Sequence, residues 1–210
     1  MRTITIPTCP YEKGQRLYLR KDATFTPGKM TVLVGCNGSG KSTLMTLIKD
    51  ALKKDKNVLC LSYDDRHNGG SNLMSKFGFY NRYDWLSEMM LSSEGEKIMI
   101  GFGDFISNLR RRISENNPKE IWIFLDAVGS GLSIDKIKEI KEFIPVVIED
   151  NVDRDVYVIV STNEFEFAKC EDCLDVTTFR HMTFSDYDSY LQYILITRAR
   201  KDRRERKIQK

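Results

Sequence analysis

The sequence predicts an α/β domain with a mainly parallel central sheet and flanking helices. Two observations carry this prediction. Short apolar runs without polar alternation are typical of strands that are covered on both faces of a parallel sheet. Segments with helical spacing or turn residues separate these runs, as the crossover connections of parallel strands require. The four apolar runs are at residues 31–34, 58–62, 121–125 and 156–161.

We expect further β elements at the N-terminus, where the first six residues alternate in polarity. The expected helices cover about 41–52, 94–115, 134–143 and 187–201. Asn116-Asn117-Pro118 should end the second helix, because proline restricts the residue before it to extended backbone. Ser133 can cap the third helix, and Pro145 then interrupts or restarts its pattern. Ser185 or Asp186 can cap the last helix.

The composition indicates one domain with a basic end. The chain has 210 residues, of which 41% are hydrophobic, and a net charge of +3, which suffices for one core and argues against disorder. Residues 198–210 carry eight basic and two acidic side chains, so removing their net +6 from +3 leaves residues 1–197 at −3. We therefore expect a domain over 1–197, with a helical subdomain at about 65–115, and a separable basic tail over 198–210.

The sequence contains no pattern typical of a membrane or secretory segment. The longest apolar runs have five residues, whereas a membrane-spanning helix needs about 20. The N-terminal residues lack the apolar region of a signal peptide. Five cysteines, an odd number, fit reduced thiols. These observations predict a cytoplasmic protein without membrane insertion.

A phosphate-binding loop follows the first apolar run. Residues 35–42 read GCNGSGKS, which matches G-x-x-x-x-G-K-S/T at every fixed position. The backbone N–H groups of such a loop converge on phosphate oxygens, and the next helix points its positive end at them. We expect Lys41 to reach the β- and γ-phosphates of a nucleotide and Ser42 to ligate Mg²⁺. The predicted phosphate-binding residues are Gly35, Cys36, Asn37, Gly38, Ser39, Gly40, Lys41, Ser42 and Thr43.

A carboxylate at the end of another predicted strand fits the same site. Asp126 directly follows the apolar run 121–125, and the carboxyl ends of parallel strands open into one crevice. A helix cap is the alternative structural role for such a residue. Because the phosphate loop is present, we expect Asp126 to hold the Mg²⁺ together with Ser42, and we assign Lys41 and Asp126 as catalytic residues.

From Thr24 to Asn163 the chain resembles the ATP-binding cassette (ABC) ATPases. Residues 125–133 read LDAVGSGLS, which is similar to the LDEPTSGLD of that family, and residues 26–30 resemble its lead-in to the phosphate loop. The resemblance implies an ABC-type P-loop fold, with ATP and Mg²⁺ as cofactors. It also implies that Tyr11 is a candidate to stack on the adenine.

The family's LSGGQ/E signature is similar to LSSEGE at residues 91–96. Ser93 and Gly95 occupy matching positions, whereas Glu94 stands where a glycine usually allows close backbone approach. The resemblance implies that Ser93 and Gly95 contact the ATP held by a second protomer, in a head-to-tail homodimer around two Mg·ATP. A capped helix start would give the same local sequence.

Two catalytic positions depart from the family pattern. Ala127 stands where the family has a glutamate that orients or deprotonates the attacking water, and a methyl group can do neither. Asn163 stands where the family has a histidine; an amide can donate a hydrogen bond but cannot take up a proton at neutral pH. Ala127 fits either an engineered substitution or a naturally weak ATPase, and Asn163 favours the latter.

The resemblance implies an ATP-binding and ATP-hydrolysing protein that drives or gates a partner or a nucleic-acid process. A hydrolysis-deficient, ATP-dependent clamp is the alternative, and a small-molecule P-loop kinase is less favoured. Ser93 and Asp126 are 33 positions apart, which looks more like the SMC and recombination branch of the family than like transporters. The aromatic segment 76–90 could stack on bases or pack a subdomain. The basic tail could contact nucleic acid or an acidic protein partner.

Overall fold

A computed structural model describes residues 2–7, 22–64 and 92–208. Within this part, six strands form the central sheet in the order β4-β5-β6-β3-β7-β8. All neighbouring pairs are parallel except β7 and β8, which are antiparallel. The bounds are β3 Met30–Val34, β4 Val58–Asp64, β5 Glu120–Asp126, β6 Asp155–Ser161, β7 Cys173–Asp175 and β8 His181–Met182. The predicted α/β fold with a mainly parallel sheet is confirmed.

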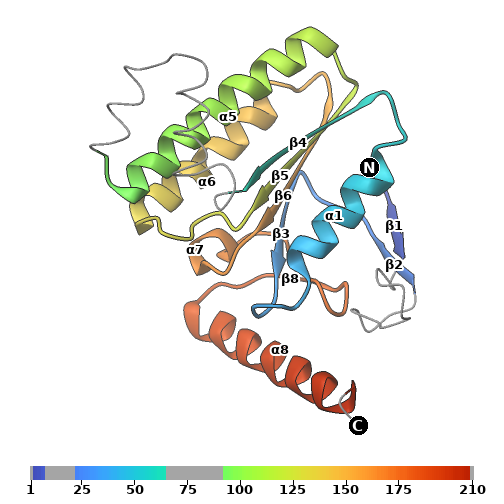
Figure 1. The fold of residues 1–210 in the computed structure, drawn as a ribbon, viewed down its shortest axis with the longest axis vertical. Helices are drawn as coiled ribbons and strands as arrows, with labels where there is room; N and C mark the ends of the chain where they lie inside the picture. Colours follow the sequence, from blue (N-terminus) through green and yellow to red (C-terminus); the bar gives the residue numbers. More distant parts are fainter. Residues whose placement is uncertain (1, 8–21, 65–91, 209–210) are drawn as a thin grey trace.

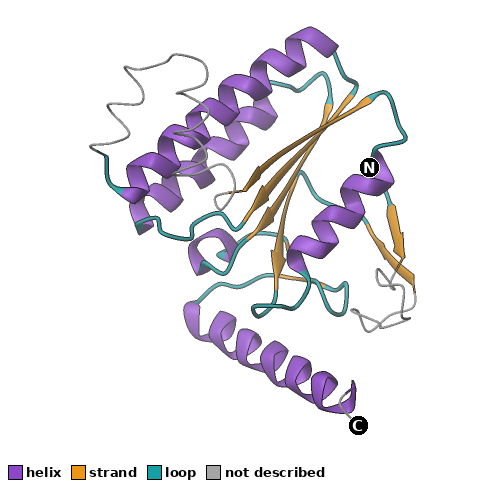
Figure 2. Ribbon diagram, in the orientation of Figure 1, coloured by secondary structure: helices purple, strands orange, loops and turns teal. Residues whose placement is uncertain are grey.

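Helices cover both faces of this sheet (Figures 1 and 2). Helices α5 and α6 lie together on one face, and α1 lies on the other. Beside α1, two N-terminal strands form a separate antiparallel pair, and their apolar side chains join the core on that face. The bounds are β1 Ile4–Pro7, β2 Asp22–Phe25, α1 Lys41–Leu52, α5 Glu94–Asn116 and α6 Ile134–Glu149.

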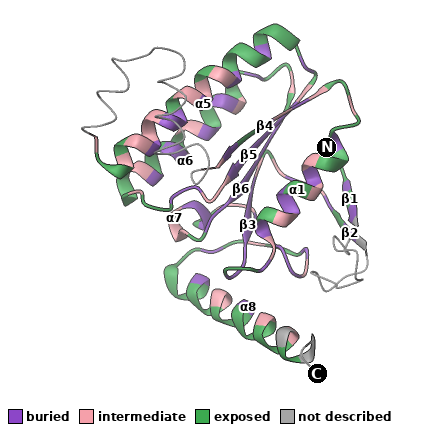
Figure 3. Ribbon diagram, viewed as in Figure 1, coloured by how far each residue is buried: buried purple, intermediate pink, exposed green. Residues whose placement is uncertain are grey.

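Strand β5 explains why the apolar runs lack alternation. Its side chains point alternately to the two faces, and both faces are buried by helices (Figure 3). Ile121 and Ile123 belong to the cluster under α5 and α6, whereas Trp122 and Phe124 belong to the cluster under α1. A strand that is covered on both faces needs apolar residues at every position.

The ends of α5 follow the sequence signals. The Ser93 side chain accepts a hydrogen bond from the Glu96 N–H at 3.3 Å, and the Glu96 carboxylate accepts one from the Ser93 N–H at 2.6 Å. This reciprocal pair is a capping box. At the other end, Asn117 adopts a left-handed conformation with φ 43° and donates its N–H to Ile113 O at 2.9 Å. The helix therefore ends directly before Pro118, as predicted.

Helix α6 differs from the expectation at Pro145. The helix continues through this proline to Glu149, although proline removes one backbone hydrogen bond. Ile144 and Val147, on either side of Pro145, are both buried in the core. Burial of these side chains favours a continuous helix, because a break would turn the last apolar turn away from the sheet.

The last helix, α8, runs from Tyr187 to Ile208. It is longer than predicted and includes most of the segment expected as a tail. Asp186 caps it by accepting a hydrogen bond from the Ser189 N–H at 2.8 Å. In Figure 1, α8 lies across the end of the molecule to which the β3 arrow points, beside the loop between β3 and α1. Among the described helices, none is long and apolar enough to cross a membrane.

Candidate functional site

The loop between β3 and α1 turns tightly at the carboxyl end of the central sheet. Strand β3 lies between β6 and β7, so the loop emerges from the middle of the sheet. Gly38 and Gly40 have φ values of 73° and 103°, a region that glycine adopts without steric cost. The Ser39 N–H donates to Cys36 O at 3.0 Å and closes the turn. The loop then leads directly into α1, which begins at Lys41.

Lys41 is held inside this loop. Its Nζ donates to Gly35 O at 2.7 Å and to Asn163 Oδ1 at 2.9 Å, and only 8% of the residue is exposed. Burial lowers the pKa of Lys41 to about 8, while Cys36 and Asp126 act in the opposite direction. A desolvated ammonium with few water contacts is well suited to bind an anion that enters the loop.

Ser42 and Asp126 meet at the open end of the sheet. The Ser42 hydroxyl lies 3.1 Å from Asp126 Oδ1, although the two residues are 84 positions apart in the chain. Asp126 is the last residue of β5, which places its carboxylate at the crevice edge of the sheet. A hydroxyl and a carboxylate are hard oxygen donors, which Mg²⁺ prefers. The residues present therefore fit a Mg²⁺ ion.

An open cavity of about 390 Å³ brings most of the predicted site residues together. Gly35, Cys36 and Ser39 do not line it. Ser39 is only 2% exposed, and its Oγ is a buried polar atom with no partner among the described residues. The cavity is lined by Asn37, Gly38, Gly40, Lys41, Ser42, Thr43, Asp126, Ala127, Ser161, Thr162 and Asn163.

Ala127 lines this cavity immediately after Asp126. Its φ is 57°, a left-handed conformation that costs an L-residue about 1–2 kcal/mol. The turn that follows is closed by a hydrogen bond from the Ser130 N–H to Ala127 O at 3.3 Å. The strained backbone holds this position at the cavity, where the side chain offers only a methyl group.

Asn163 connects the loop after β6 to the phosphate loop. Its Nδ2 donates to Asn37 Oδ1 at 2.7 Å, while its Oδ1 accepts the hydrogen bond from Lys41. The neighbouring Thr162 hydroxyl donates to Val128 O at 2.8 Å. The segments after β3, β5 and β6 are therefore tied to one another by side-chain hydrogen bonds.

The signature-like residues lie apart from this cavity. Ser93 and Gly95 are at the N-terminus of α5 and do not line it. A Cβ placed on Gly95 would lie 3.8 Å from Gly131 O, so the start of α5 is next to the turn that follows Ala127. In this chain Ser93 caps its own helix. Tyr11 and the aromatic segment 76–90 lie outside the described residues.

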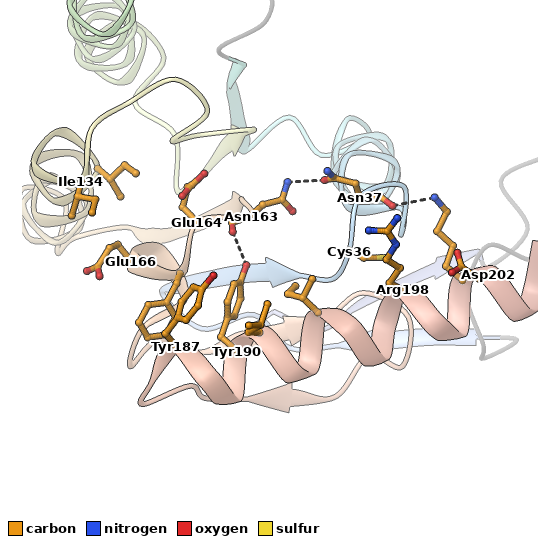
Figure 4. A pocket seen from close by; sticks show the side chains of 15 residues that line it. Cys36, Asn37, Ile134, Asn163, Glu164, Glu166, Tyr187, Tyr190, Arg198 and Asp202 are labelled. Atoms are coloured by element: carbon orange, nitrogen blue, oxygen red, sulfur yellow. Dashed lines mark hydrogen bonds between the residues drawn. The ribbon is translucent and has the colours of Figure 1, made fainter.

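Sequence reasoning missed the contacts that α8 makes with the phosphate loop. Lys201 Nζ donates to Asn37 O at 3.2 Å, although the segment 198–210 was expected to be separable. The Thr197 hydroxyl accepts a hydrogen bond from the Cys36 N–H at 3.1 Å. A second cavity, of about 660 Å³, lies beside these contacts, and Asn37 and Asn163 line both cavities (Figure 4). Regular spacing along α8 is the sequence signal that could have indicated this face.

The model of one protein family, described as ABC transporter, matches residues 20–142, which is more than half of the chain. The chain belongs to the ABC transporter family. It is thus an ATP-binding ABC protein with a P-loop, and membership implies binding of ATP and Mg²⁺. No curated protein matches the sequence significantly.

Two solved structures of ABC proteins are similar to this one. The first is cbiO1 from Clostridium perfringens, described as part of the ABC transporter complex cbiONQ, with a TM-score of 0.51 and 16% identity over 85% of this chain and 86% of its own. The second is the dimeric ATP-binding cassette MJ0796 in a post-hydrolysis state with ADP and Pi, with a TM-score of 0.46 and 14% identity over 82% of this chain and 92% of its own. At 16% identity, the first supports the fold alone. The comparisons give the ABC family and not the SMC and recombination branch that the sequence favoured.

Proposed function

We propose that this ABC protein binds Mg·ATP at the phosphate loop, closes head-to-tail on a second copy of itself, and hydrolyses ATP slowly. The observation that carries the proposal is the convergence of Lys41, Ser42 and Asp126 on one open cavity. An ammonium and two oxygen donors at the N-terminus of α1 are the groups that a Mg²⁺-bound triphosphate requires.

Each of these side chains has a distinct role in the proposal. Lys41 binds the β- and γ-phosphates, while the N–H groups of the loop donate hydrogen bonds to the phosphate oxygens. Ser42 and Asp126 hold the Mg²⁺, which neutralises charge on the phosphates when it is bound. The tight turn of the loop places these groups together at the carboxyl end of the sheet.

Slow hydrolysis follows from two positions that line the cavity. Ala127 supplies no group that could take a proton from water. Asn163 can donate to a phosphate oxygen through Nδ2, but an amide stays neutral at physiological pH. The same observation at Ala127 supports a second candidate function, in which the protein is a clamp that closes on ATP and does not hydrolyse it.

Helix α5 would contribute to the dimer interface. The N-terminus of this helix carries positive potential from 23 residues of aligned peptide dipoles. In a head-to-tail dimer, Ser93 and Gly95 at this end would face the triphosphate of the partner subunit. A triphosphate that contacts both copies would bind the dimer more tightly than a single copy, and ATP would thereby favour the dimer.

We extend the proposal to a partner for the basic end of α8. Arg203 and Arg206 are exposed on the last turns of this helix, and such a cluster attracts phosphate backbones. Nucleic acid is the partner that we favour, and an acidic protein is the alternative.

The proposal is tested by titrating the chain with a fluorescent ATP analogue, with Mg²⁺ and with EDTA, while light scattering reports the molar mass. We expect Mg²⁺-dependent binding and a shift from monomer to dimer. Lys41→Ala should abolish binding, and Ser93→Arg should preserve binding but prevent the dimer. Lys54→Ala is the matched control, because Lys54 is exposed just beyond α1. A chain that binds no nucleotide would overturn the proposal.

A further inference from the structure

Four polar side chains on α8 share one face of the helix. Tyr190, Tyr193, Thr197 and Lys201 follow one another at intervals of three, four and four residues, which places them in one stripe along an α-helix. This stripe faces the phosphate loop, the end of β3 and the segment after β6. Each of the four side chains forms a hydrogen bond with a backbone atom of the phosphate loop, of the last residue of β3 or of the segment after β6.

Thr197 makes the most buried of these contacts. The residue is 1% exposed, and its hydroxyl accepts the Cys36 N–H at 3.1 Å while it donates to Ile194 O at 2.8 Å. Cys36 is buried as well, so its N–H has no access to bulk water. A buried N–H without an acceptor costs about 1–3 kcal/mol, and a residue 161 positions later in the chain supplies that acceptor.

Two tyrosines fix the segments on either side of this contact. The Tyr193 hydroxyl donates to Val34 O at 3.2 Å, at the end of β3. The Tyr190 hydroxyl donates to Asn163 O at 2.9 Å. Burial raises the pKa of both tyrosines well above the ordinary value, so both hydroxyls keep the proton that they donate.

Lys201 lies over the turn of the loop. Its Nζ donates to Asn37 O at 3.2 Å and lies 2.7 Å from the position that a Cβ on Gly38 would occupy. Any larger residue at position 38 would displace this ammonium. The absent side chain of Gly38 therefore makes room for a second positive charge beside the loop that already holds Lys41.

We propose that α8 is a positioning element of the nucleotide site, in which Tyr193 and Thr197 fix the backbone of the phosphate loop and Lys201 adds positive charge at its turn. The inference rests on the proposed function, because it requires that ATP binds to this loop. Thr197 and Lys201 should then affect the affinity for ATP, although neither residue belongs to a phosphate-binding motif. Because linkage is reciprocal, bound ATP would also stabilise the docked position of α8.

Thr197 is tested with a pair of substitutions and a stability control. Thr197→Val keeps the shape but removes the acceptor for Cys36, and we expect the Kd for Mg·ATP to rise about tenfold. Thr197→Ser restores the hydroxyl and should bind as the parent does. Ile113→Val, in the core under α5, should lower stability through lost packing and leave the Kd unchanged.

Lys201 provides a second test that does not depend on a buried residue. Lys201→Met keeps most of the side-chain length without the charge, and we expect several-fold weaker ATP binding with an unchanged melting temperature. Lys138→Met, on the exposed face of α6, is the matched control. Salt should reduce the difference between Lys201→Met and the parent, because screening weakens the effect of an accessible charge.

The outcomes separate this inference from the proposed function. If the parent chain binds Mg·ATP but both Thr197→Val and Lys201→Met bind it equally well, the inference is overturned and the proposed function stands. The inference also fails if Thr197→Ser binds as weakly as Thr197→Val, because the hydroxyl then has no role. A parent chain that binds no Mg·ATP overturns the proposed function, and this inference with it.

Discussion

The ammonium of Lys41 lies 2.9 Å from Asn163 Oδ1, and this hydrogen bond joins the phosphate loop to the end of β6. The amide of Asn163 can serve both neighbours, because its oxygen accepts from Lys41 and its Nδ2 donates to Asn37. A protonated histidine at this position would place a second positive charge beside Lys41. The neutral amide therefore stabilises the loop without repelling the ammonium.

Substitution of Lys41 should separate folding from ligand binding. Burial lowers the pKa of Lys41 to about 8, so below pH 8 the folded protein holds a charge that the unfolded chain solvates better. We expect Lys41→Met to abolish ATP binding yet raise the free energy of unfolding at pH 7 by roughly 1–3 kcal/mol. Urea unfolding measures this difference.

The pH dependence of the free energy of unfolding tests the same cost of burying the Lys41 charge. Between pH 8 and the ordinary lysine pKa of 10.5, the folded protein loses the Lys41 proton while the unfolded chain keeps it. The parent therefore gains stability relative to Lys41→Met in this interval, and the difference between their free energies of unfolding becomes smaller. A gap that stays constant from pH 7 to pH 10.5 would show that burial of the Lys41 charge does not limit stability.

Substitution at Ala127 tests whether a base is all that hydrolysis lacks. Because Ala127 lines the cavity, a glutamate there would reach the space beside Ser42 and Asp126. We expect Ala127→Glu to raise the rate of phosphate release by about 10²-fold, at the low end of general-base effects. Both residues carry a Cβ, so the left-handed φ of 57° penalises them about equally.

Ala127→Gln is the matched control, because its amide has the same size without a basic oxygen. Equal phosphate release by the two variants would favour the clamp over a weak ATPase. The assay needs saturating Mg·ATP, so that the rate reports hydrolysis and not binding.

Substitution of the metal-facing carboxylate should change how ATP affinity depends on Mg²⁺. Asp126→Asn removes the charge beside Ser42 but keeps the shape, and we expect the gain in affinity on adding Mg²⁺ to fall by about 10–100-fold. Isothermal titration of ATP with Mg²⁺ and with EDTA gives this gain directly. Asp153→Asn, an exposed carboxylate after α6, should leave it intact. An unchanged Mg²⁺ effect in Asp126→Asn would remove this residue from the metal site.

Features that depend on a few consecutive residues could be predicted from the sequence. The phosphate loop, the strand that ends at Asp126 and the cap at Ser93 each depend on a few consecutive residues, and local backbone preferences determine their form. The course of α6 through Pro145 could not be predicted, because it depends on how deeply Ile144 and Val147 are buried. Local pattern identifies a helix but not the depth of its packing.

The contacts of α8 are harder to predict for the same reason. Thr197 and Lys201 read as ordinary polar positions of a helix with a basic end, and nothing near them in the sequence indicates which surface they meet. Their partners Cys36 and Asn37 are more than 160 positions away. The spacing marks one face of the helix, but the surface that this face meets is known only when the fold brings the last helix to the loop that follows β3.

Two truncations should separate the roles of the basic end. Deletion of residues 203–210 removes a net +4 but retains Lys201, so we expect ATP binding to persist while affinity for a short DNA or RNA duplex at low salt falls at least tenfold. Deletion of 198–210 also removes Lys201 and should weaken both. Fluorescence anisotropy measures the duplex, and the ATP analogue measures the nucleotide site. Equal duplex binding by the parent and the 203–210 deletion would leave the acidic protein as the partner of this end.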